Sequence, residues 1–541
     1  MPRNAAHKSF SKLVLLNRAH RGVPMAGAKA NAFIRSLLRA AAFPHPTAEI
    51  RYLETHISWV VLTGPYAYKI KKPVTLRFLD FSTVELRKHF CDEELRLNRR
   101  WAPDLYLGVV EIRGAPESAT IEGHGPLIDY AVKMVQFPQD ARLDAQLAAG
   151  TLDNDDMRSL ATMLAAKHRD ADVKTPEISE SVSGPMMDNF DDIAKHFDQA
   201  PLHSLKAWTV SALKQLRPYL DDRREHGFIR ECHGDLHLAN LVRLESGITA
   251  FDCVEFSAKL RDIDVMSDVA FLVMDLVARQ RDDLAYEFLN RYLELSGDYE
   301  GMRLFDLYFV YHCLIRAKIA VIRGSERSNP LDAQADEDEL LHHLADARNC
   351  VSGPPPIVIA MHGFSGSGKT WISERLMRAL PAVRIRSDVE RKRLHGYGDT
   401  ESSSSAIGQG IYTDAASIAV YERLAEITTA LTLSGHSTII DASFLKLTQR
   451  KQMRDLASRM GVHFLMIDTD ASRSKLAARL RAREADASEA DFSVLQHQLE
   501  SADPLTPNER TATIFIDTGA PVEIEPYVRQ IRARADGLVQ I

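Results

Sequence analysis

The chain has 541 residues, of which 45% are hydrophobic and 26% are charged. One hydrophobic core does not normally organise a chain of this length, so two to four domains are expected. The formal net charge of −7 argues against a general coat for nucleic acids or membrane surfaces. Apolar runs all fall short of the about 18–20 residues of a membrane helix. Five scattered cysteines without a C-x-x-C pair favour reduced thiols and a cytoplasmic location.

The first part of the chain changes from an extension to strands and then to helices. Residues 1–44 begin with the basic segment MPRNAAHKSFSKLVLLNRAHRG, which faintly resembles a transit peptide. We favour a partly disordered extension, or an upstream start before Met25. Short β-branched and aromatic runs from residue 50 to 135 predict strands, interrupted by the helix STVELRKHFCDEELRLNRRW. Helical patterns follow residue 140, which is the order of a bilobal α+β fold like that of protein kinases.

A different pattern begins after the proline triplet of VSGPPP, which fits neither a helix nor a central strand. PIVIAM, STIID, HFLMID and TATIFID predict short buried strands between amphipathic helices, as in a parallel α/β sheet. We therefore predict four parts: the extension 1–44, a kinase-like domain 45–325, a helical and proline-rich linker 326–355, and a P-loop domain 356–541.

GFSGSGKT, residues 363–370, follows the strand PIVIAM and precedes a helix, and it satisfies G-x-x-x-x-G-K-[ST]. The glycines allow backbone N–H groups to wrap the phosphates of ATP. Lys369 supplies charge to the β- and γ-phosphates, and Thr370 supplies a hydroxyl to Mg²⁺. The predicted nucleotide-binding residues are Gly363, Phe364, Ser365, Gly366, Ser367, Gly368, Lys369 and Thr370.

Four more residues are candidates for this site. Asp441 ends the strand STIID and could hold the magnesium shell, although it could also cap a helix. Asp388, in RIRSDVERKRL, is a candidate base for a substrate hydroxyl, again with helix capping as the competing interpretation. Arg479 and Arg483 lie one helical turn apart and could close over the nucleotide as a lid, or simply form a solvated basic face.

The combination GFSGSGKT, RSDVERKRL, STIIDASF and RLRAREADASEADFSVLQ spans roughly residues 355–541. It resembles the small P-loop kinases grouped with polynucleotide 5′-kinases, zeta-toxin-like and chloramphenicol-phosphotransferase-like proteins. The resemblance implies a catalytic aspartate at Asp388 and lid arginines at Arg479 and Arg483. The acceptor stays open between a small metabolite, a sugar-like hydroxyl and a 5′-hydroxyl of nucleic acid.

The stretch ECHGDLHLAN, residues 231–240, contains a second chemical motif. His233 and His237 would share a face only in a helix, and the glycine after His233 favours a loop, so a zinc site is disfavoured. H-G-D-x-x-x-x-N has the spacing of the kinase catalytic loop H-R-D-x-x-x-x-N. Asp235 would then accept the hydroxyl proton, Asn240 would bind Mg²⁺, and Asp252, at the end of ITAFD, would be the second metal ligand.

HGDLHLAN together with AFDCVEF resembles the aminoglycoside phosphotransferase and choline-kinase-like family, over roughly residues 45–325. The resemblance implies the protein-kinase fold, Asp235 as the base, and Asn240 and Asp252 as metal ligands. It also implies that Asp264 and Asp268 brace the loop. Two features depart from the protein-kinase pattern, since the chain has neither D-F-G after the strand nor G-x-G-x-x-G over the phosphates.

The small lobe should also supply a lysine–glutamate pair that holds the phosphates. In YAYKIKKPV, Lys69 and Lys71 point to the same side of a strand because side chains alternate. Lys69 is our choice, with Lys71 a close second. On the following helix Glu94 faces the sheet, and Glu93 is the alternative. YAVKMVQFP fits the linker between lobes that holds the adenine.

These patterns predict a bifunctional kinase that uses ATP and Mg²⁺ at both sites. The acceptor of the first site is expected to be a hydroxyl on a small molecule. Nucleic acid is a candidate partner of the C-terminal domain only, no membrane partner is expected, and the oligomeric state is open. The alternative is a regulatory protein in which one domain binds nucleotide and gates the other without phosphotransfer of its own.

Overall fold

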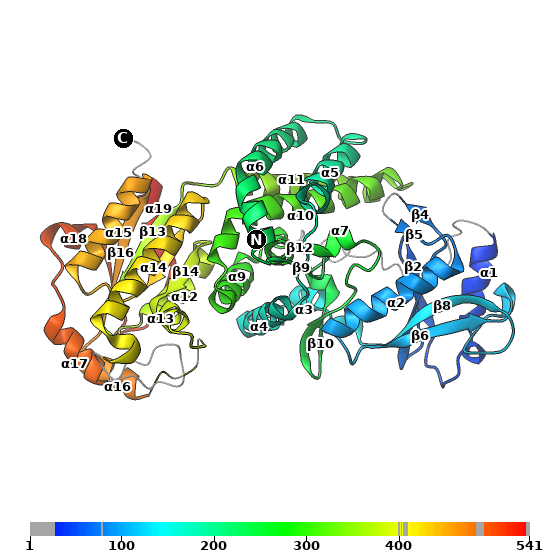
Figure 1. Cartoon of the computed structure of the whole chain (residues 1–541), viewed down its shortest axis with the longest axis horizontal. Coiled ribbons are helices and arrows are strands. Elements are labelled where there is room, and N and C mark those ends of the chain that lie inside the picture. Colours follow the sequence, from blue (N-terminus) through cyan, green and yellow to red (C-terminus); the bar gives the residue numbers. More distant parts are fainter. Residues whose placement is uncertain are drawn as a thin grey trace, which may run out of the picture. The chain divides into compact units, whose positions relative to one another are not determined.

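The computed structural model describes residues 28–76, 79–398, 401, 403, 409–482 and 492–536. Figure 1 shows their helices and strands. The chain divides into two compact units. Unit 1 comprises Met1–Asp156, Ala166–Pro185 and Asp221–Leu272, and unit 2 comprises Met157–Ala165, Met186–Leu220 and Val273–Ile541. The domain boundaries expected from the sequence stay a prediction.

Unit 1 contains a six-stranded antiparallel sheet with the strand order β1-β2-β3-β8-β6-β7. Its strands are β1 (Arg51–Glu54), β2 (Ser58–Leu62), β3 (Tyr66–Lys71), β6 (Tyr106–Arg113), β7 (Thr120–Ile121) and β8 (Leu127–Val135). Helix α2 (Val84–Trp101) packs against β6 and β8, and Thr83 caps its first turn by accepting the N–H of Leu86 (Figure 1). A short antiparallel pair, β4 (Thr75–Leu76) and β5 (Leu79–Asp80), accompanies the sheet.

The two faces of this sheet are chemically different because side chains alternate along each strand. Tyr68 and Ile70 of β3 are buried in a core that includes Phe33 of α1 (Ala28–Ser36). Lys69 and Lys71 therefore lie on the opposite face, toward α2. Residues 28–44 of the predicted extension thus contribute to this core, while residues 1–27 lie outside the described residues.

The remaining elements of unit 1 frame the H-G-D loop. β9 (Ile229–Glu231) pairs with β12 (Asp262–Asp264), and β10 (Leu241–Leu244) pairs with β11 (Gly247–Ala250), both antiparallel. The helices here are α3 (Leu143–Ala149), α7 (Ala258–Arg261), part of α4 (Asn154–Asp170) and the first half of α8 (Val265–Ala278). The loop therefore follows β9, and the β10–β11 hairpin separates it from Asp252.

Unit 2 combines a group of helices with a parallel sheet. The helices include α5 (Gly184–Ala194), most of α6 (Ala200–Glu225), α9 (Asp282–Ser296), α10 (Met302–Ser325) and α11 (Pro330–Val351). The five-stranded parallel sheet has the order β14-β15-β13-β16-β17. Its strands are β13 (Ile357–His362), β14 (Val383–Arg386), β15 (Thr438–Asp441), β16 (His463–Asp470) and β17 (Thr513–Asp517).

Helices connect the parallel strands, as the predicted alternation requires. They are α12 (Lys369–Ala379), α13 (Ser387–Leu394), α14 (Asp414–Leu433), α15 (Leu447–Met460), α16 (Arg473–Arg481), α17 (Phe492–Ser501), α18 (Pro507–Ala512) and α19 (Glu525–Asp536). One face of the sheet forms a core of Ile359, Ile439 and Ile467 with Ile372 and Leu376 of α12. Both predicted fold classes are confirmed. Among the described residues, no helix combines the length and apolarity needed to cross a membrane.

Candidate active sites

The first candidate site is the loop between β9 and the 3₁₀ turn Leu238–Asn240 in unit 1. The side-chain amide of Asn240 donates to the backbone oxygen of Asp235 at 3.0 Å and to its carboxylate Oδ2 at 2.9 Å. The Asp235 side chain is 41% exposed, whereas Asn240 is buried. The loop therefore presents an accessible carboxylate in a fixed orientation, which a base for a substrate hydroxyl requires.

The backbone of this loop is held by Asp268 in the first turn of α8. The two carboxylate oxygens of Asp268 accept the N–H groups of His233 at 2.8 Å and Gly234 at 2.9 Å. Burial alone would raise the pKa of Asp268, but His168 and the backbone donors outweigh burial and lower that pKa. Asp268 is therefore an ionised carboxylate that fixes the path of the loop.

Asp264, the other acid expected to brace the loop, is the last residue of β12, directly before α8. It accepts hydrogen bonds from Nε and Nη2 of Arg223, both at 2.7 Å, and from the N–H of Met266 at 2.9 Å. His233 is fully buried, its Nε2 lies 3.0 Å from the backbone oxygen of Phe251, and burial lowers its pKa. His233 is thus a packing and hydrogen-bonding residue in this loop.

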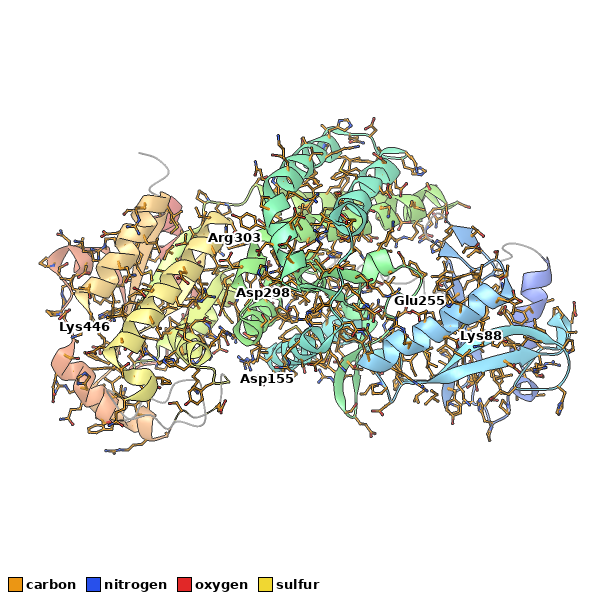
Figure 2. All side chains as sticks on the ribbon, viewed as in Figure 1. Lys88, Asp155, Glu255, Asp298, Arg303 and Lys446 are labelled. Atoms are coloured by element: carbon orange, nitrogen blue, oxygen red, sulfur yellow. The ribbon has the colours of Figure 1, made fainter. Side chains whose placement is uncertain are left out.

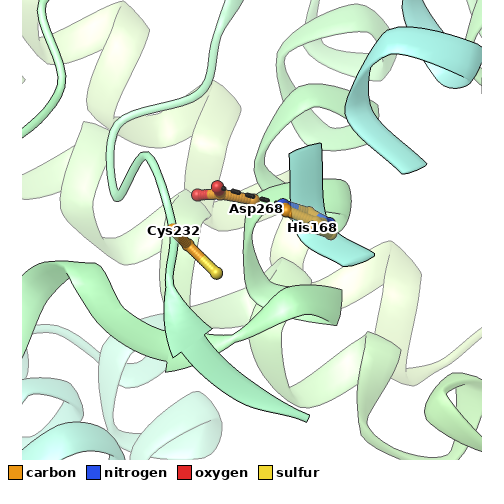
Figure 3. A group of neighbouring side chains, drawn as sticks. All are labelled: His168, Cys232 and Asp268. Atoms are coloured by element: carbon orange, nitrogen blue, oxygen red, sulfur yellow. Dashed lines mark hydrogen bonds and ion pairs between the residues drawn. The ribbon is translucent and has the colours of Figure 1, made fainter. Parts of the chain in front are cut away.

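His168, Cys232 and Asp268 form a buried group whose potential metal-ligating atoms lie within 4.8 Å of one another (Figure 3). Both oxygens of Asp268 already accept backbone N–H groups, and Sγ of Cys232 donates to the backbone oxygen of Ile263 at 3.5 Å. Burial raises the pKa of the Cys232 thiol, which opposes the thiolate that zinc binds. The group is a hydrogen-bonded support for the loop.

Asp252 has a left-handed backbone with φ of 64°. Its N–H donates to the hydroxyl of Tyr106 at 3.1 Å, and the next N–H, that of Cys253, donates to Oδ1 of Asn98 at 2.9 Å. A non-glycine residue in this region costs about 1–3 kcal/mol and persists only where its surroundings hold it. Tyr106 and Asn98 therefore orient Asp252. Sequence reasoning missed both residues, because no local pattern marks them.

Two lysines and three acids meet on the α2 face of the sheet. Nζ of Lys69 lies 2.8 Å from Oε1 of Glu94 and also contacts the carboxylate of Asp252. Nζ of Lys71 lies 2.8 Å from Oε2 of Glu94 and also contacts Glu255, which is labelled in Figure 2. Both candidate lysines thus share Glu94, and Lys69 is the one that reaches Asp252.

Glu94, the residue of α2 that faces these lysines, is fully buried. Burial alone would raise the pKa of Glu94, but Lys69 and Lys71 outweigh it and lower that pKa to about 2. Glu93, the alternative, pairs instead with Arg96 at 2.9 Å. The structure therefore brings Lys69, Lys71 and Glu94 together and places Glu93 in another ion pair.

The resemblance of this half implies Mg²⁺, and the residues present fit that ion. Oδ1 of Asn240 is buried and has no hydrogen-bond partner among the described residues. Because Nδ2 of Asn240 donates to Asp235, the amide orientation leaves Oδ1 for a cation. The carboxylate of Asp252 is a second oxygen donor, and Mg²⁺ prefers oxygen ligands.

The second candidate site lies at the carboxyl end of β13, the central strand of the unit 2 sheet. Gly363 has φ of 137°, and a Cβ there would lie 2.4 Å from the backbone oxygen of Thr469. Nζ of Lys369, the first residue of α12, donates to the backbone oxygens of Gly363 at 3.0 Å and Phe364 at 2.9 Å. The loop thus wraps around the lysine, as a phosphate cradle at a helix N-terminus does.

The other loop residues connect this cradle to its surroundings. Oγ of Ser367 lies 2.8 Å from Oγ1 of Thr469, and the N–H of Ser365 donates to Oε1 of Gln498 at 2.8 Å. Phe364 packs on the buried side chains of Leu476 and Leu495. The loop is therefore held by β16, α16 and α17 as well as by its own glycines.

Asp441, Asp388 and Thr370 lie at or after the carboxyl ends of neighbouring parallel strands, which lie at one edge of the sheet. Oδ2 of Asp441 accepts from Oγ of Ser373 at 3.1 Å, and the same hydroxyl lies 3.1 Å from the backbone oxygen of Thr370. The backbone oxygen of Asp441 accepts from Oγ of Ser387 at 3.2 Å. Asp388 follows in the first turn of α13 and is half-buried. The Thr370 hydroxyl and the Asp441 carboxylate are oxygen donors of the kind that Mg²⁺ prefers, and that ion is expected at the second site.

Arg479 lies in α16 and reaches the P-loop. It donates to the backbone oxygen of Gly366 at 3.2 Å and to Oγ1 and the backbone oxygen of Thr518 at 3.0 and 2.6 Å. Its guanidinium is therefore fixed beside the cradle. Arg483, the second predicted lid arginine, lies outside the described residues.

Comparisons with known proteins found similarities to both halves of the chain. A model of the AAA domain family matches residues 358–505, which contain the P-loop. An uncharacterized protein of Mycobacterium tuberculosis strain H37Rv is 28% identical over 457 residues, which are 81% of this chain and 88% of that protein.

Two solved structures are similar to different parts of the chain. A gluconokinase from Sinorhizobium meliloti is 24% identical and covers 34% of this chain and 97% of its own, with a TM-score of 0.24. A choline/ethanolamine kinase family protein from Mesorhizobium loti is 14% identical and covers 60% of this chain and 96% of its own, with a TM-score of 0.39.

The two resemblances expected from the sequence are confirmed at the level of fold. The antiparallel sheet with α2 and the H-G-D loop form the core of a kinase-like fold in unit 1. The parallel sheet, the glycine cradle and the family match identify a P-loop domain in unit 2. The chain therefore has a kinase-like domain in each half.

Proposed function

We propose that the chain is a bifunctional ATP-dependent phosphotransferase, in which each site transfers the γ-phosphate of ATP to a hydroxyl group. The proposal rests mainly on one observation: Asn240 fixes Asp235 through two hydrogen bonds while its own buried Oδ1 keeps no partner among the described residues. This arrangement supports a role for Asp235 as a base beside a metal ligand, Asn240. A buried acceptor normally has a partner, and in this proposal the metal ion would be that partner of Oδ1.

At the first site, Asp235 would accept the proton of the acceptor hydroxyl as the oxygen attacks phosphorus. Lys69, oriented by Glu94, would hold the α- and β-phosphates. Asn240 and Asp252 would hold Mg²⁺. When bound, that ion neutralises charge on the phosphates.

At the second site, the P-loop amides and Lys369 would hold the β- and γ-phosphates, with Thr370 and Asp441 toward Mg²⁺. Asp388 would accept the proton of the acceptor hydroxyl. Arg479 stands beside the cradle, where a guanidinium can neutralise charge that develops during transfer. The two sites therefore use the same chemistry on different scaffolds.

The acceptors are proposed by class only. The first site would take a hydroxyl on a small molecule, and the second a metabolite or a 5′-hydroxyl of nucleic acid. The net charge of −7 favours the metabolite, because a polyanion is repelled unless a basic groove attracts it. A cytoplasmic location is part of this proposal, since the five cysteines are free.

The test uses the full-length protein, γ-labelled ATP with Mg²⁺, and a metabolite and nucleic-acid extract of the source cells. Asp235→Asn should abolish one labelled product while ATP still binds, because the base is lost and the phosphate ligands remain. Lys369→Ala should remove nucleotide binding and any product at the second site only. Labelled products are identified by mass spectrometry.

The pattern of losses separates the candidate functions. A product lost in only one variant assigns that acceptor to that site. If both variants, still folded, lose every product equally, the two sites are not independent. If ATP binds at both sites and no fraction of the extract is labelled, one half acts as a regulatory nucleotide-binding domain.

A further inference from the structure

Helix α9 (Asp282–Ser296) belongs to unit 2, where it packs against α12 and β14 of the P-loop part (Figure 1). In the sequence it precedes the predicted linker and falls within the range predicted for the kinase-like domain. Three of its polar side chains, Glu287, Asn290 and Glu294, are 3%, 1% and 3% exposed. Buried polar groups of this kind normally have specific partners, and each of these three has at least one partner in the P-loop part.

Asn290 pairs with the outer edge of the sheet. β14 is an edge strand, and an edge strand presents backbone N–H and C=O groups that no strand satisfies. The side-chain amide of Asn290 accepts the N–H of Arg384 at 2.6 Å and donates to the backbone oxygen of Ala382 at 3.0 Å. One side chain thus replaces the missing neighbour strand at two consecutive backbone groups on this edge.

Glu294 and the end of α9 hold the next two elements. Oε1 of Glu294 lies 2.8 Å from Nη2 of the buried Arg384. The backbone oxygen of Glu294 accepts from the guanidinium of Arg393, which belongs to α13. Gly297, the C-cap of α9, leaves room for this contact, because a Cβ there would lie 2.8 Å from Nε of Arg393.

Glu287 makes the corresponding contact with the helix that begins at the P-loop lysine. Its Oε2 accepts from Nε of Arg378 in α12 at 2.6 Å, and its Oε1 accepts from Nε of Arg158 at 2.7 Å. Glu374 of α12 also pairs with both arginines. Helix α9 therefore contacts three elements of the P-loop part. They are α12, which begins with Lys369, α13, which contains Asp388, and β14, the strand that precedes α13.

We propose that Asn290 and Glu294 are positioning residues of the second phosphotransfer site. They hold β14 and α13 so that Asp388, in the first turn of α13, faces the nucleotide bound at α12. The inference rests on the proposed function of that site and adds that residues 356–541 alone do not form all of it. Helix α9, which precedes the predicted linker, supplies packing and hydrogen bonds that support the P-loop site.

The experiment compares Asn290→Ala with Asn189→Ala in the full-length protein. Asn189 is also a buried helical asparagine of unit 2, 2% exposed, and its Oδ1 accepts from Nζ of Lys318 at 2.5 Å. Both variants lose a buried amide from a helix of unit 2, and urea unfolding of each variant measures the general loss of stability separately. Amide hydrogen exchange is followed by mass spectrometry over residues 383–394, which include the Arg384 N–H that Asn290 protects.

We expect Asn290→Ala to speed exchange in residues 383–394 by about tenfold or more, because a buried hydrogen bond to that backbone is lost. Asn189→Ala should leave these residues unchanged. In Asn290→Ala, the kcat of any product that requires Lys369 should also fall by about tenfold, and in Asn189→Ala it should not. The Kd of Mg·ATP should change less than about twofold in both variants, because ATP is held by the P-loop rather than by α13.

The outcomes separate the inference from the function on which it rests. Equal exchange over residues 383–394 in the two variants would overturn the positioning role, and so would faster exchange with an unchanged kcat. If the wild-type protein forms no product that requires Lys369, the proposed function fails. The exchange comparison then still decides whether α9 holds β14.

Discussion

Replacing Tyr106 by phenylalanine tests how the first site holds Asp252, its proposed metal ligand. The substitution keeps the buried ring and removes only the hydroxyl that accepts the N–H of Asp252 at 3.1 Å. A buried donor left without a partner costs about 1–3 kcal/mol. The left-handed backbone of Asp252 costs about the same amount. Loss of the hydroxyl should therefore be enough to shift Asp252 away from the metal-binding conformation.

The expected effect follows from these magnitudes. A free-energy change of about 1–3 kcal/mol corresponds to about a 5- to 150-fold weaker apparent affinity for Mg²⁺ at the first site. The assay titrates Mg²⁺ against binding of a fluorescent ATP analogue, in a Lys369→Ala background that silences the second site. The Mg²⁺ midpoint should rise, while binding of the nucleotide at saturating Mg²⁺ should change little.

The control is Tyr68→Phe in the same sheet. Tyr68 is fully buried, and its hydroxyl lies 2.9 Å from Nε2 of His45, in the core on the face away from α2. Its loss should lower the free energy of unfolding without changing the Mg²⁺ midpoint. If Tyr106→Phe and Tyr68→Phe give the same Mg²⁺ midpoint as the parent, Tyr106 has no role in orienting Asp252 and the reasoning is wrong.

Two further predictions concern unit 2. Gly363→Ala should reduce the stoichiometry of Mg·ATP binding from two to one by calorimetry, because its Cβ would lie 2.4 Å from the Thr469 oxygen. Gly461→Ala, also at positive φ but with open space around it, should keep two. Burial, helped by Arg316, lowers the pKa of His343 to about 3 from 6.5, so only the unfolded chain binds a proton between these pH values. The free energy of unfolding therefore keeps the full contribution of neutral His343 above pH 6.5. It falls as the pH drops toward 3, by about 2 kcal/mol at pH 5. In urea unfolding at pH 7 and 5, His343→Leu should remove this loss, and an unchanged pH dependence would contradict it.

The sequence predicted those features whose chemical groups lie close together within one short segment of the chain. GFSGSGKT and HGDLHLAN each place their chemical groups within about ten consecutive residues, and a strand or a turn on either side fixes the rest. Alternation along YAYKIKK was likewise enough to put Lys69 and Lys71 on one face. Alternation alone does not distinguish the two lysines, and in the structure each contacts a different oxygen of Glu94.

The residues that could not be predicted act across long sequence separations. Asn98 and Tyr106 reach backbone groups near residue 252, and Asn290 reaches the edge strand at Arg384. The sequence around an asparagine or tyrosine in an amphipathic element does not indicate which distant backbone group it will contact. Only the packed structure brings the donor and the acceptor together, so propensity and periodicity cannot identify them.

The chain lacks the D-F-G motif of protein kinases, and polar contacts fix the segment after Asp252 instead. Where that motif would place a phenylalanine after the aspartate, this chain has Cys253. The N–H of Cys253 donates to Asn98, and Glu255 contacts Lys71. These contacts start from α2 and β3, the same elements that present Glu94 and Lys69. The segment that contains Asp252 is therefore connected to Lys69, the proposed phosphate-binding lysine, through shared partners. The absence of the phenylalanine does not by itself exclude the proposed site.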